Sequence, residues 1–164
     1  SVKGSISFKH PSIGDQVFRF TSEQSFQKEI ASARTFGFVR EVDYLHKKGL
    51  ALGASLKNAV VLDEERIINP EGLRYGNEFV RHKVLDTIGD LALLGMTMQA
   101  AIEVHKSGHE LHAAFLRKVL EDPSNYQIID SNSSGTARKN SRVVEMEDEE
   151  LPLVAAASVA MPAF

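Results

Sequence analysis

The segment that most constrains the fold is 77–94, where apolar residues recur at helical spacing until Gly95. A glycine just past the last apolar residue suits the left-handed backbone that ends many helices. Within this segment, His82, Asp86 and Asp90 follow one another at intervals of four residues. Because an α-helix has about 3.6 residues per turn, these three side chains share one stripe. The sequence therefore predicts a long helix with a polar stripe along an apolar body.

Two chemical interpretations of this stripe are open. A neutral imidazole and a carboxylate one turn apart can fill two positions around a zinc ion, as in helical metalloenzyme motifs. The alternative is a helix that carries partly exposed polar side chains beside Leu85, Ile88 and Leu91. The chain has no cysteine, so any metal has to bind through His, Asp or Glu.

Length and composition set limits on the class of protein. A chain of 164 residues, 43% hydrophobic and 25% charged, is typical of one globular domain. The net charge of -3 gives no bulk attraction for nucleic acid or an anionic membrane. The sequence has no run of 18 apolar residues, so no transmembrane segment is expected. It begins at Ser1 and enters a strand-like run almost at once, which we interpret as the middle of a longer protein.

Changes in periodicity predict the other elements. The predicted strands are 3–9, 16–20, 98–104 and 126–129, with a hairpin of 58–62 and 66–68. The predicted helices are 22–34, 39–46 and 109–120, in addition to 77–94. Gly49 suits the end of the helix 39–46. From Ser131 onward the chain is polar and then acidic, which predicts a disordered tail.

A second candidate cluster, Lys106-Ser107-Gly108-His109, lies at a predicted turn from strand to helix. Backbone N–H groups and a cation can face an anion at such a turn. His109 is a candidate catalytic residue there, and the alternative is a surface residue at the helix N-terminus. His109 and His112 are three residues apart. The helical zinc-protease motif needs four, so this pair does not favour a metal site.

Five motifs in order, 33–38, 49–53, 71–74, 77–90 and 106–109, resemble the second half of the UDP-3-O-acyl-N-acetylglucosamine deacetylase family. The resemblance runs from about residue 4 to residue 129. It implies a cytoplasmic zinc amidase that commits lipid A synthesis in Gram-negative bacteria. The implied substrate is UDP-3-O-acyl-N-acetylglucosamine, and the implied cofactor is Zn²⁺.

The resemblance also implies a role for each matching residue in catalysis. His82 and Asp86 match the residues that bind the catalytic zinc. Asp90 matches the carboxylate that holds the imidazole at His109, which stabilises the oxyanion or protonates the leaving amine. Thr35 matches a residue placed to donate to the oxyanion; by itself it is equally a hydroxyl that ends a helix.

Other matching residues are implied to contact the substrate. Phe36 is implied to lie against the sugar, although a core anchor is the alternative. Lys83 and Lys106 are implied to contact the glucosamine and diphosphate end, whereas Lys83 alone could be a solvated helix residue. The implied passage for the acyl chain comprises Phe38, Gly53 and the rest of residues 39–55.

By resemblance the fold is α+β. It is a two-layer sandwich with a mixed β-sheet packed against two main helices, near 22–34 and 77–94, and with a βαβ-like insert. Residues 1–130 would form the second, C-terminal domain and 131–164 a tail. The family's first domain is expected to be absent from this chain.

The family's third zinc ligand and general-base Glu come from its first domain, and the sequence has no equivalent. This chain is therefore expected to supply half of an active site and to need the missing N-terminal domain as a partner. The alternative is an inactive structural or partner-binding fragment, or a degenerate homologue. Retention of His82, Asp86, Asp90 and His109 together argues against degeneration.

Overall fold

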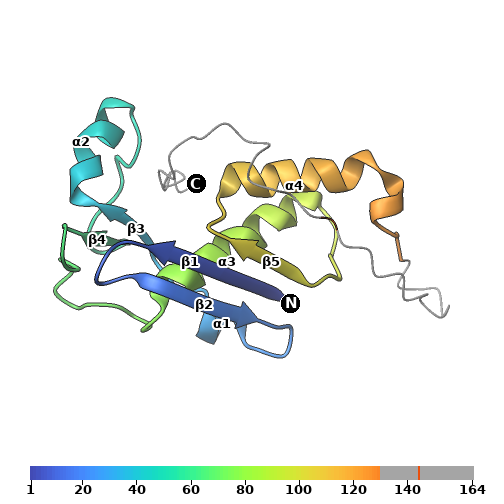
Figure 1. Cartoon of the computed structure of the whole chain (residues 1–164), viewed down its shortest axis with the longest axis horizontal. Helices are drawn as coiled ribbons and strands as arrows, with labels where there is room; N and C mark the ends of the chain where they lie inside the picture. The colour runs from blue at the N-terminus through green and yellow to red at the C-terminus, as the bar shows by residue number, and fades with distance from the viewer. Residues whose placement is uncertain (130–143, 145–164) are drawn as a thin grey trace.

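The computed structural model describes residues 1–129 and Val144, and its strands form two sheets in that part of the chain (Figure 1). The larger sheet has the strand order β2-β1-β5. Strand β1 (Val2–Phe8) is antiparallel to β2 (Gly14–Phe20) and parallel to β5 (Ile102–His105). In the smaller sheet, β3 (Thr35–Phe38) runs parallel to β4 (Ala59–Leu62).

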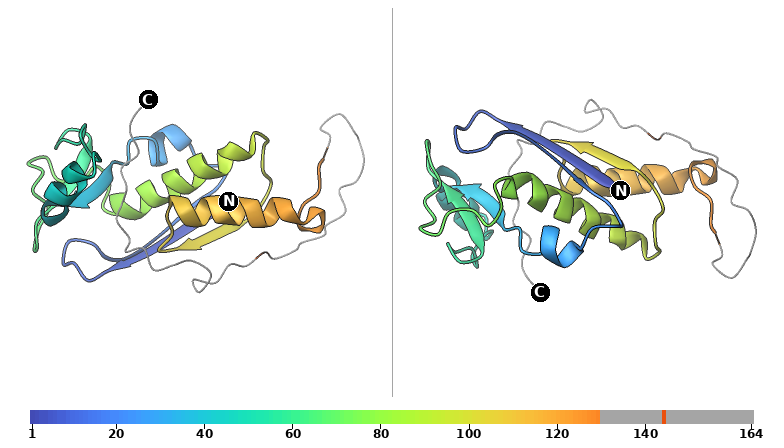
Figure 2. Two further views of the ribbon diagram at one scale, coloured as in Figure 1. Left: turned by 90° about the horizontal axis from the view of Figure 1, so that it is seen from above. Right: turned by 90° about the horizontal axis from the view of Figure 1, so that it is seen from below.

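Two long helices form the second layer. Helix α3 (Glu78–Leu91) packs against β1 and β2, and it continues into a short 3-10 helix, η1 (Ala92–Leu94). Gly95 follows with a φ of 72°, as the sequence predicts. Helix α4 (His109–Glu121) packs against α3, and Figure 2 shows the two helices side by side. The predicted α+β arrangement of a mixed sheet and two main helices is confirmed.

A βαβ unit forms the insert. Helix α2 (Val39–Lys47) connects the parallel strands β3 and β4. Gly49 has a φ of 71°, which agrees with the predicted end of this helix. The turn from Asn69 to Gly72 is closed by a 3.0 Å hydrogen bond from the Gly72 amide to the Asn69 carbonyl.

The identity of one main helix was predicted wrongly. Instead of a helix over 22–34, the chain forms only α1 (Phe26–Glu29), and α4 is the second long helix. Ile30 and Ala33 are buried as the pattern requires, but the backbone turns after Ile30. The amide of Arg34 donates to a carboxylate oxygen of Glu78 at 2.9 Å instead of to a helical carbonyl. A tertiary contact therefore overrides the local helical pattern.

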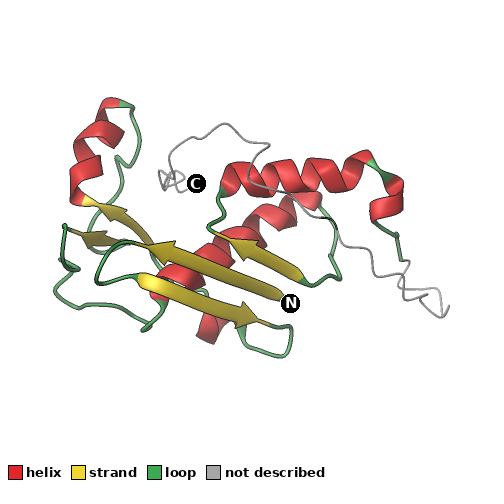
Figure 3. Ribbon diagram, in the orientation of Figure 1, coloured by secondary structure: helices red, strands yellow, loops and turns green. Residues whose placement is uncertain are grey.

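Three strand predictions also differ from the structure. Residues 126–129 form no strand (Figure 3), and β5 begins at Ile102, not at residue 98. The predicted hairpin is reduced to β4 and one bridge between Leu62 and Ile67. Beyond β4 the chain follows a turn held by its own side chain, because Asp63 accepts from the amides of Glu65 and Arg66. The predicted disorder from Ser131 lies outside the described residues.

The core joins both sheets to α3. Phe36 of β3 is 4% exposed and packs edge to face on Phe79 of α3, with ring centroids 5.0 Å apart. Where α3 crosses β1, Gly4 leaves the space needed, because a Cβ there would lie 2.7 Å from a methyl group of Val84. This packing fixes α3, and so its polar stripe, relative to β1 and β3. No helix in the described part is long and apolar enough to cross a membrane.

Candidate active site

The first part of the site is a pair of ligand-type side chains on α3. Nε2 of His82 lies 3.2 Å from Oδ1 of Asp86, and the side chains are 14% and 12% exposed. Nδ1 of His82 lies 3.1 Å from the carbonyl oxygen of Ala33. Since a carbonyl only accepts hydrogen bonds, Nδ1 carries the proton of a neutral ring and Nε2 keeps its lone pair. His82 and Asp86 therefore place two electron-pair donors 3.2 Å apart.

This pair has the chemistry and spacing of neighbouring zinc ligands. Zinc takes His nitrogen and carboxylate oxygen at about 2.0–2.1 Å, so two tetrahedral ligands lie roughly 3.3 Å apart. The observed 3.2 Å between Nε2 and Oδ1 is close to this value. A carbonyl partner on the other nitrogen of the ring is the usual outer contact of a metal-binding His. The residues present therefore fit the ion.

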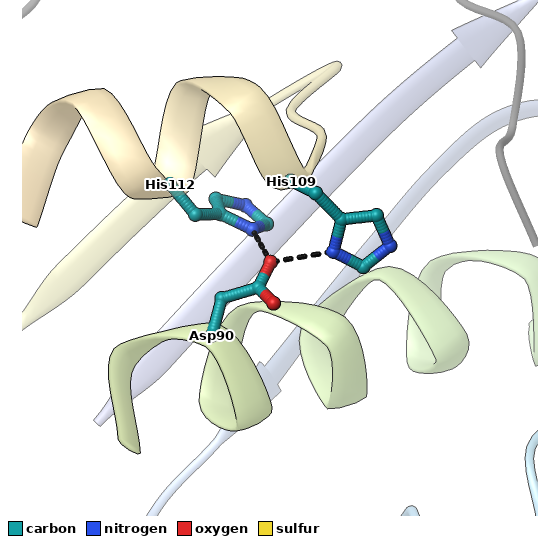
Figure 4. Close-up of side chains that lie close together, drawn as sticks. All are labelled: Asp90, His109 and His112. Atoms are coloured by element: carbon teal, nitrogen blue, oxygen red, sulfur yellow. Dashed lines mark hydrogen bonds and ion pairs between the residues drawn. The ribbon is translucent and has the colours of Figure 1, made fainter. Parts of the chain in front are cut away.

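The second part of the site joins the next turn of α3 to the start of α4. Oδ2 of Asp90 lies 2.7 Å from Nδ1 of His109, which is typical of a charge-assisted hydrogen bond. The bond fixes the ring and leaves Nε2 of His109 directed away from Asp90 (Figure 4). An imidazole held in this way can give or take a proton at Nε2. The stripe thus carries a candidate metal pair and, one turn on, the carboxylate that holds a candidate acid from α4.

A third histidine, His112, belongs to this cluster. Its Nδ1 lies 2.6 Å from the same Oδ2 of Asp90, and the residue is 3% exposed (Figure 4). Asp90, His109 and His112 can bring three ligand atoms within 4.8 Å of one another. The two oxygen-to-nitrogen distances are those of hydrogen bonds, well short of the roughly 3.3 Å between tetrahedral zinc ligands. This cluster is therefore a hydrogen-bonded network, whereas His82 and Asp86 have the spacing of metal ligands.

Thr35 begins β3, and the two residues just before it bind α3. The carbonyl of Ala33, which binds the His82 ring, lies two residues before Thr35. Between them, Arg34 is buried and its Nε donates to Oε1 of Glu78 at 2.9 Å. Glu78 lies one helical turn before His82. The start of β3 is therefore held against the same part of α3 that carries the candidate metal ligands.

The residues expected to contact substrate are spread more widely. Lys83 lies on α3, and its Nζ is 3.8 Å from Oδ2 of Asp86. Lys106 is exposed, with a left-handed φ of 49° just before α4. Phe36 belongs to the core, and Phe38 packs against it. Gly53 is exposed in the loop after α2, where its carbonyl accepts from the Asn58 side chain at 3.0 Å.

Sequence reasoning missed His112. It considered His109 and His112 only as a pair of metal ligands, for which a spacing of three is wrong. The same spacing places both rings on one face of a helix, and this signal could have indicated a shared partner. That partner, Asp90, lies 22 residues before His112 in the sequence.

The α+β fold thus presents a His–Asp pair on α3 and a carboxylate-held imidazole at the start of α4. Residues 1–121 match the family of UDP-3-O-acyl N-acetylglycosamine deacetylases. The chain is 53% identical over 122 residues to the UDP-3-O-acyl-N-acetylglucosamine deacetylase of Syntrophus aciditrophicus, which covers 74% of this chain and 39% of that protein. The chain belongs to this deacetylase family.

Two further relatives carry the same name. The protein of Wolinella succinogenes is 52% identical over 126 residues, or 76% of this chain and 42% of the relative. That of Nitratiruptor sp. is 51% identical over 130 residues, or 79% of this chain and 44% of the relative. The chain thus spans about two fifths of the length of the curated relatives it matches.

Proposed function

We propose that this chain supplies half of the active site of a zinc-dependent deacetylase. The reaction is hydrolysis of the acetamide of UDP-3-O-acyl-N-acetylglucosamine, the committed step of lipid A synthesis, in the cytoplasm. The observation that carries the proposal is the pair of donors 3.2 Å apart on His82 and Asp86, in a chain of the deacetylase family. A third ligand and a general base come from a segment outside this sequence. The span of two fifths of the relatives' length supports that division.

His82 and Asp86 would hold the zinc ion. When bound, zinc polarises the amide carbonyl and makes water more acidic. Ala33 keeps the His82 ring in the tautomer that leaves Nε2 free, because its carbonyl accepts from Nδ1. Both side chains are largely covered by the fold, at 14% and 12% exposed. The chain's own part in binding the ion is to hold these two donors in place before the ion arrives.

The chain's other residues would act on the reacting amide. Water adds to the acetamide carbonyl, the C–N bond breaks, acetate leaves and the sugar amine takes a proton. The Thr35 hydroxyl donates to the oxyanion that develops on the carbonyl oxygen. His109 gives a proton from Nε2 to the departing nitrogen. Asp90 orients the His109 ring, since a carboxylate oxygen lies 2.7 Å from Nδ1.

Contacts with the rest of the substrate are also part of the proposal. Lys83 and Lys106 carry the charges that suit the polar glucosamine and diphosphate end. Phe36 is 4% exposed, so little of its ring is open to a sugar. Phe38, Gly53 and the rest of residues 39–55 would form the acyl-chain passage.

The test is a chimera in which residues 1–121 replace the matched part of the Syntrophus aciditrophicus deacetylase. We expect the chimera to bind zinc and to release acetate from UDP-3-O-acyl-N-acetylglucosamine. The 164-residue chain alone is expected to bind zinc weakly and to hydrolyse nothing, since it holds two of the ligands and no general base. Acetate release and zinc content, measured on both proteins, check this.

Two outcomes would contradict the proposal. One is strong deacetylase activity from the 164-residue chain by itself, which would show that it is not half of a site. The other is a chimera that unfolds cooperatively and contains zinc but releases no acetate. That result would favour an inactive structural fragment.

A separate prediction concerns the acyl-chain passage. Leu52 lies in the loop after α2 and is 73% exposed. If residues 39–55 hold the chain, Leu52→Trp should block part of the passage in the chimera. Each buried methylene contributes about 0.8 kcal/mol. Excluding about four of them should lower the preference for acylated over unacylated substrate on the order of 10²-fold.

The matched control is Leu120→Trp, because Leu120 is an exposed leucine near the end of α4, on the opposite side of the molecule from α2 (Figure 1). It should leave the preference unchanged. The measurement is the ratio of kcat/KM for the two substrates in each variant. An unchanged ratio in Leu52→Trp would place the passage elsewhere.

A further inference from the structure

Asp90 has two imidazole partners, and the function proposed above uses only one of them. His109 and His112 both direct Nδ1 to Oδ2 of Asp90, at 2.7 and 2.6 Å (Figure 4). An ionised carboxylate only accepts, so both Nδ1 atoms donate. His112 is 3% exposed, whereas a third of the His109 side chain is open to solvent. The buried ring is therefore placed to act on the carboxylate and has no direct access to a substrate.

The other nitrogen of His112 is also engaged. Its Nε2 lies 2.9 Å from Oγ of Ser107 and 3.2 Å from Oγ1 of Thr87. The Thr87 hydroxyl donates to the Lys83 carbonyl at 2.8 Å, so Ser107 supplies the proton to Nε2. Burial lowers the pKa of His112, and its bond to Asp90 offsets this only in part. A neutral ring with its proton on Nδ1 fits the bonds to Asp90 and Ser107, and the Thr87 hydroxyl lies beside Nε2 without donating to it.

The resulting chain of bonds joins three parts of the site. Ser107 donates to His112, and His112 and His109 both donate to Asp90. Ser107 follows Lys106, which has a left-handed backbone. The bonds thus connect the loop before α4, the first turns of α4 and the stripe on α3. An Asp side chain held from two sides by hydrogen bonds cannot rotate without breaking one of them.

We propose that His112 is a positioning residue, which holds the Asp90 carboxylate and through it sets the ring of His109 for the proposed deacetylation. This inference rests on the proposed function. The competing explanation is a buried histidine whose hydrogen bonds serve stability alone. The two explanations make different predictions for His109. His112 has no hydrogen bond to the His109 ring, so only the positioning role predicts that a change at His112 displaces that ring.

Two variants test the hydrogen bonds of His112 to Asp90 and to Ser107 separately. In His112→Leu both of these hydrogen bonds are lost. In His112→Asn the amide nitrogen lies near the position of Nδ1 and can still donate to Asp90, while the bond from Ser107 is lost. The positioning role therefore predicts that His112→Leu displaces the His109 ring, whereas His112→Asn keeps the ring in place. A role in stability alone predicts that the two variants change melting temperature and nothing specific at His109.

The first readout needs no activity. In the full 164-residue chain with labelled histidine, NMR follows the Nδ1 proton and nitrogen of His109. We expect the His109 Nδ1–H signal, hydrogen-bonded to Asp90, in the wild type and in His112→Asn. In His112→Leu it should exchange with water and be lost. If His112→Leu does not unfold cooperatively, His112→Gln replaces it, since a Gln amide reaches the Nε2 position and Ser107 and not Asp90.

The second readout uses the chimera described above. A misplacement of about 1 Å can cost on the order of 10²-fold in rate. We expect kcat to fall about 10- to 100-fold in His112→Leu with KM within about twofold, and to return to within about threefold of wild type in His112→Asn. An unchanged His109 signal together with unchanged kcat in a folded His112→Leu protein would overturn the inference. If every chimera is inactive, the proposed function fails, and the NMR result still decides the role of His112.

Discussion

Replacing Asp86 or His82 with alanine in the chimera is expected to remove bound zinc and lower kcat/KM by more than about 10³-fold. The two side chains hold the donors 3.2 Å apart, and neither donor can be supplied by alanine. Loss of the ion removes several kcal/mol of stabilisation from the transition state. About 4 kcal/mol corresponds to 10³-fold in rate. The measurements are metal content and acetate release.

Matched controls exist for both substitutions. His105 is an exposed histidine on β5, and Asp15 is an exposed aspartate on β2. Alanine at either position should leave zinc content and kcat/KM within about twofold of the parent. Zinc retained in full by both Asp86→Ala and His82→Ala would show that other residues hold the ion.

The second histidine cluster offers a direct comparison with this pair. If Asp90, His109 and His112 held the metal instead, His112→Leu would lose zinc and Asp86→Ala would keep it. The hydrogen-bond distances of 2.6 and 2.7 Å in that cluster lead us to expect the reverse. Zinc content of these two variants therefore separates the two candidate centres.

Sequence periodicity predicted the elements that are amphipathic and have clear end signals. The helix over 77–94 was recognised because its apolar pattern is long and Gly95 closes it, and both features recur in α3 and η1. The i, i+4 spacing also predicted that His82 and Asp86 share one side of the helix, since that geometry is local. Local information was sufficient in these cases.

Prediction failed where a distant residue decides the local structure. The pattern over 22–34 is helical, and Ile30 and Ala33 are buried as a helix would bury them. The Arg34 amide nevertheless bonds to Glu78, 44 residues away. His112 was missed for the same reason, because its partner Asp90 is on another helix. Neither pairing leaves a periodic signal in a single sequence.

Replacing Arg34 with methionine is expected to destabilise the 164-residue chain by about 3–5 kcal/mol. The Arg34 and Glu78 side chains are 2% and 0% exposed. The Glu78 carboxylate accepts from the Arg34 backbone and side chain and from the Arg74 amide. Without Arg34, the buried Glu78 carboxylate keeps its charge at neutral pH but loses its ion-pair partner. An unpaired buried charge lowers the free energy of unfolding strongly. Urea unfolding at neutral pH measures the loss.

Two controls test the cause of this loss. Arg66 pairs with Asp63 on the surface and is 80% exposed, so Arg66→Met should cost no more than about 1 kcal/mol. The double variant Arg34→Met with Glu78→Gln removes the buried charge as well. It should recover a substantial part of the loss, because the penalty comes from the unpaired carboxylate.

The pH dependence gives the sharpest test of this pair. Burial raises the pKa of Glu78, but the hydrogen bonds and charge of Arg34 outweigh it, so the folded pKa lies below the ordinary 4.5. A lowered pKa contributes stability that is present above about pH 4.5 and is lost as pH falls through the folded pKa. In Arg34→Met the charge and side-chain hydrogen bonds of Arg34 are lost, while the burial and the two backbone amides remain, so the pKa of Glu78 should lie above its wild-type value. Acid then neutralises the unpaired carboxylate.

The gap in unfolding free energy between wild type and Arg34→Met should therefore narrow from pH 7 to pH 4. A gap that stays constant over this range, or that is below about 1 kcal/mol at pH 7, would mean that the buried pair does not fix β3 against α3.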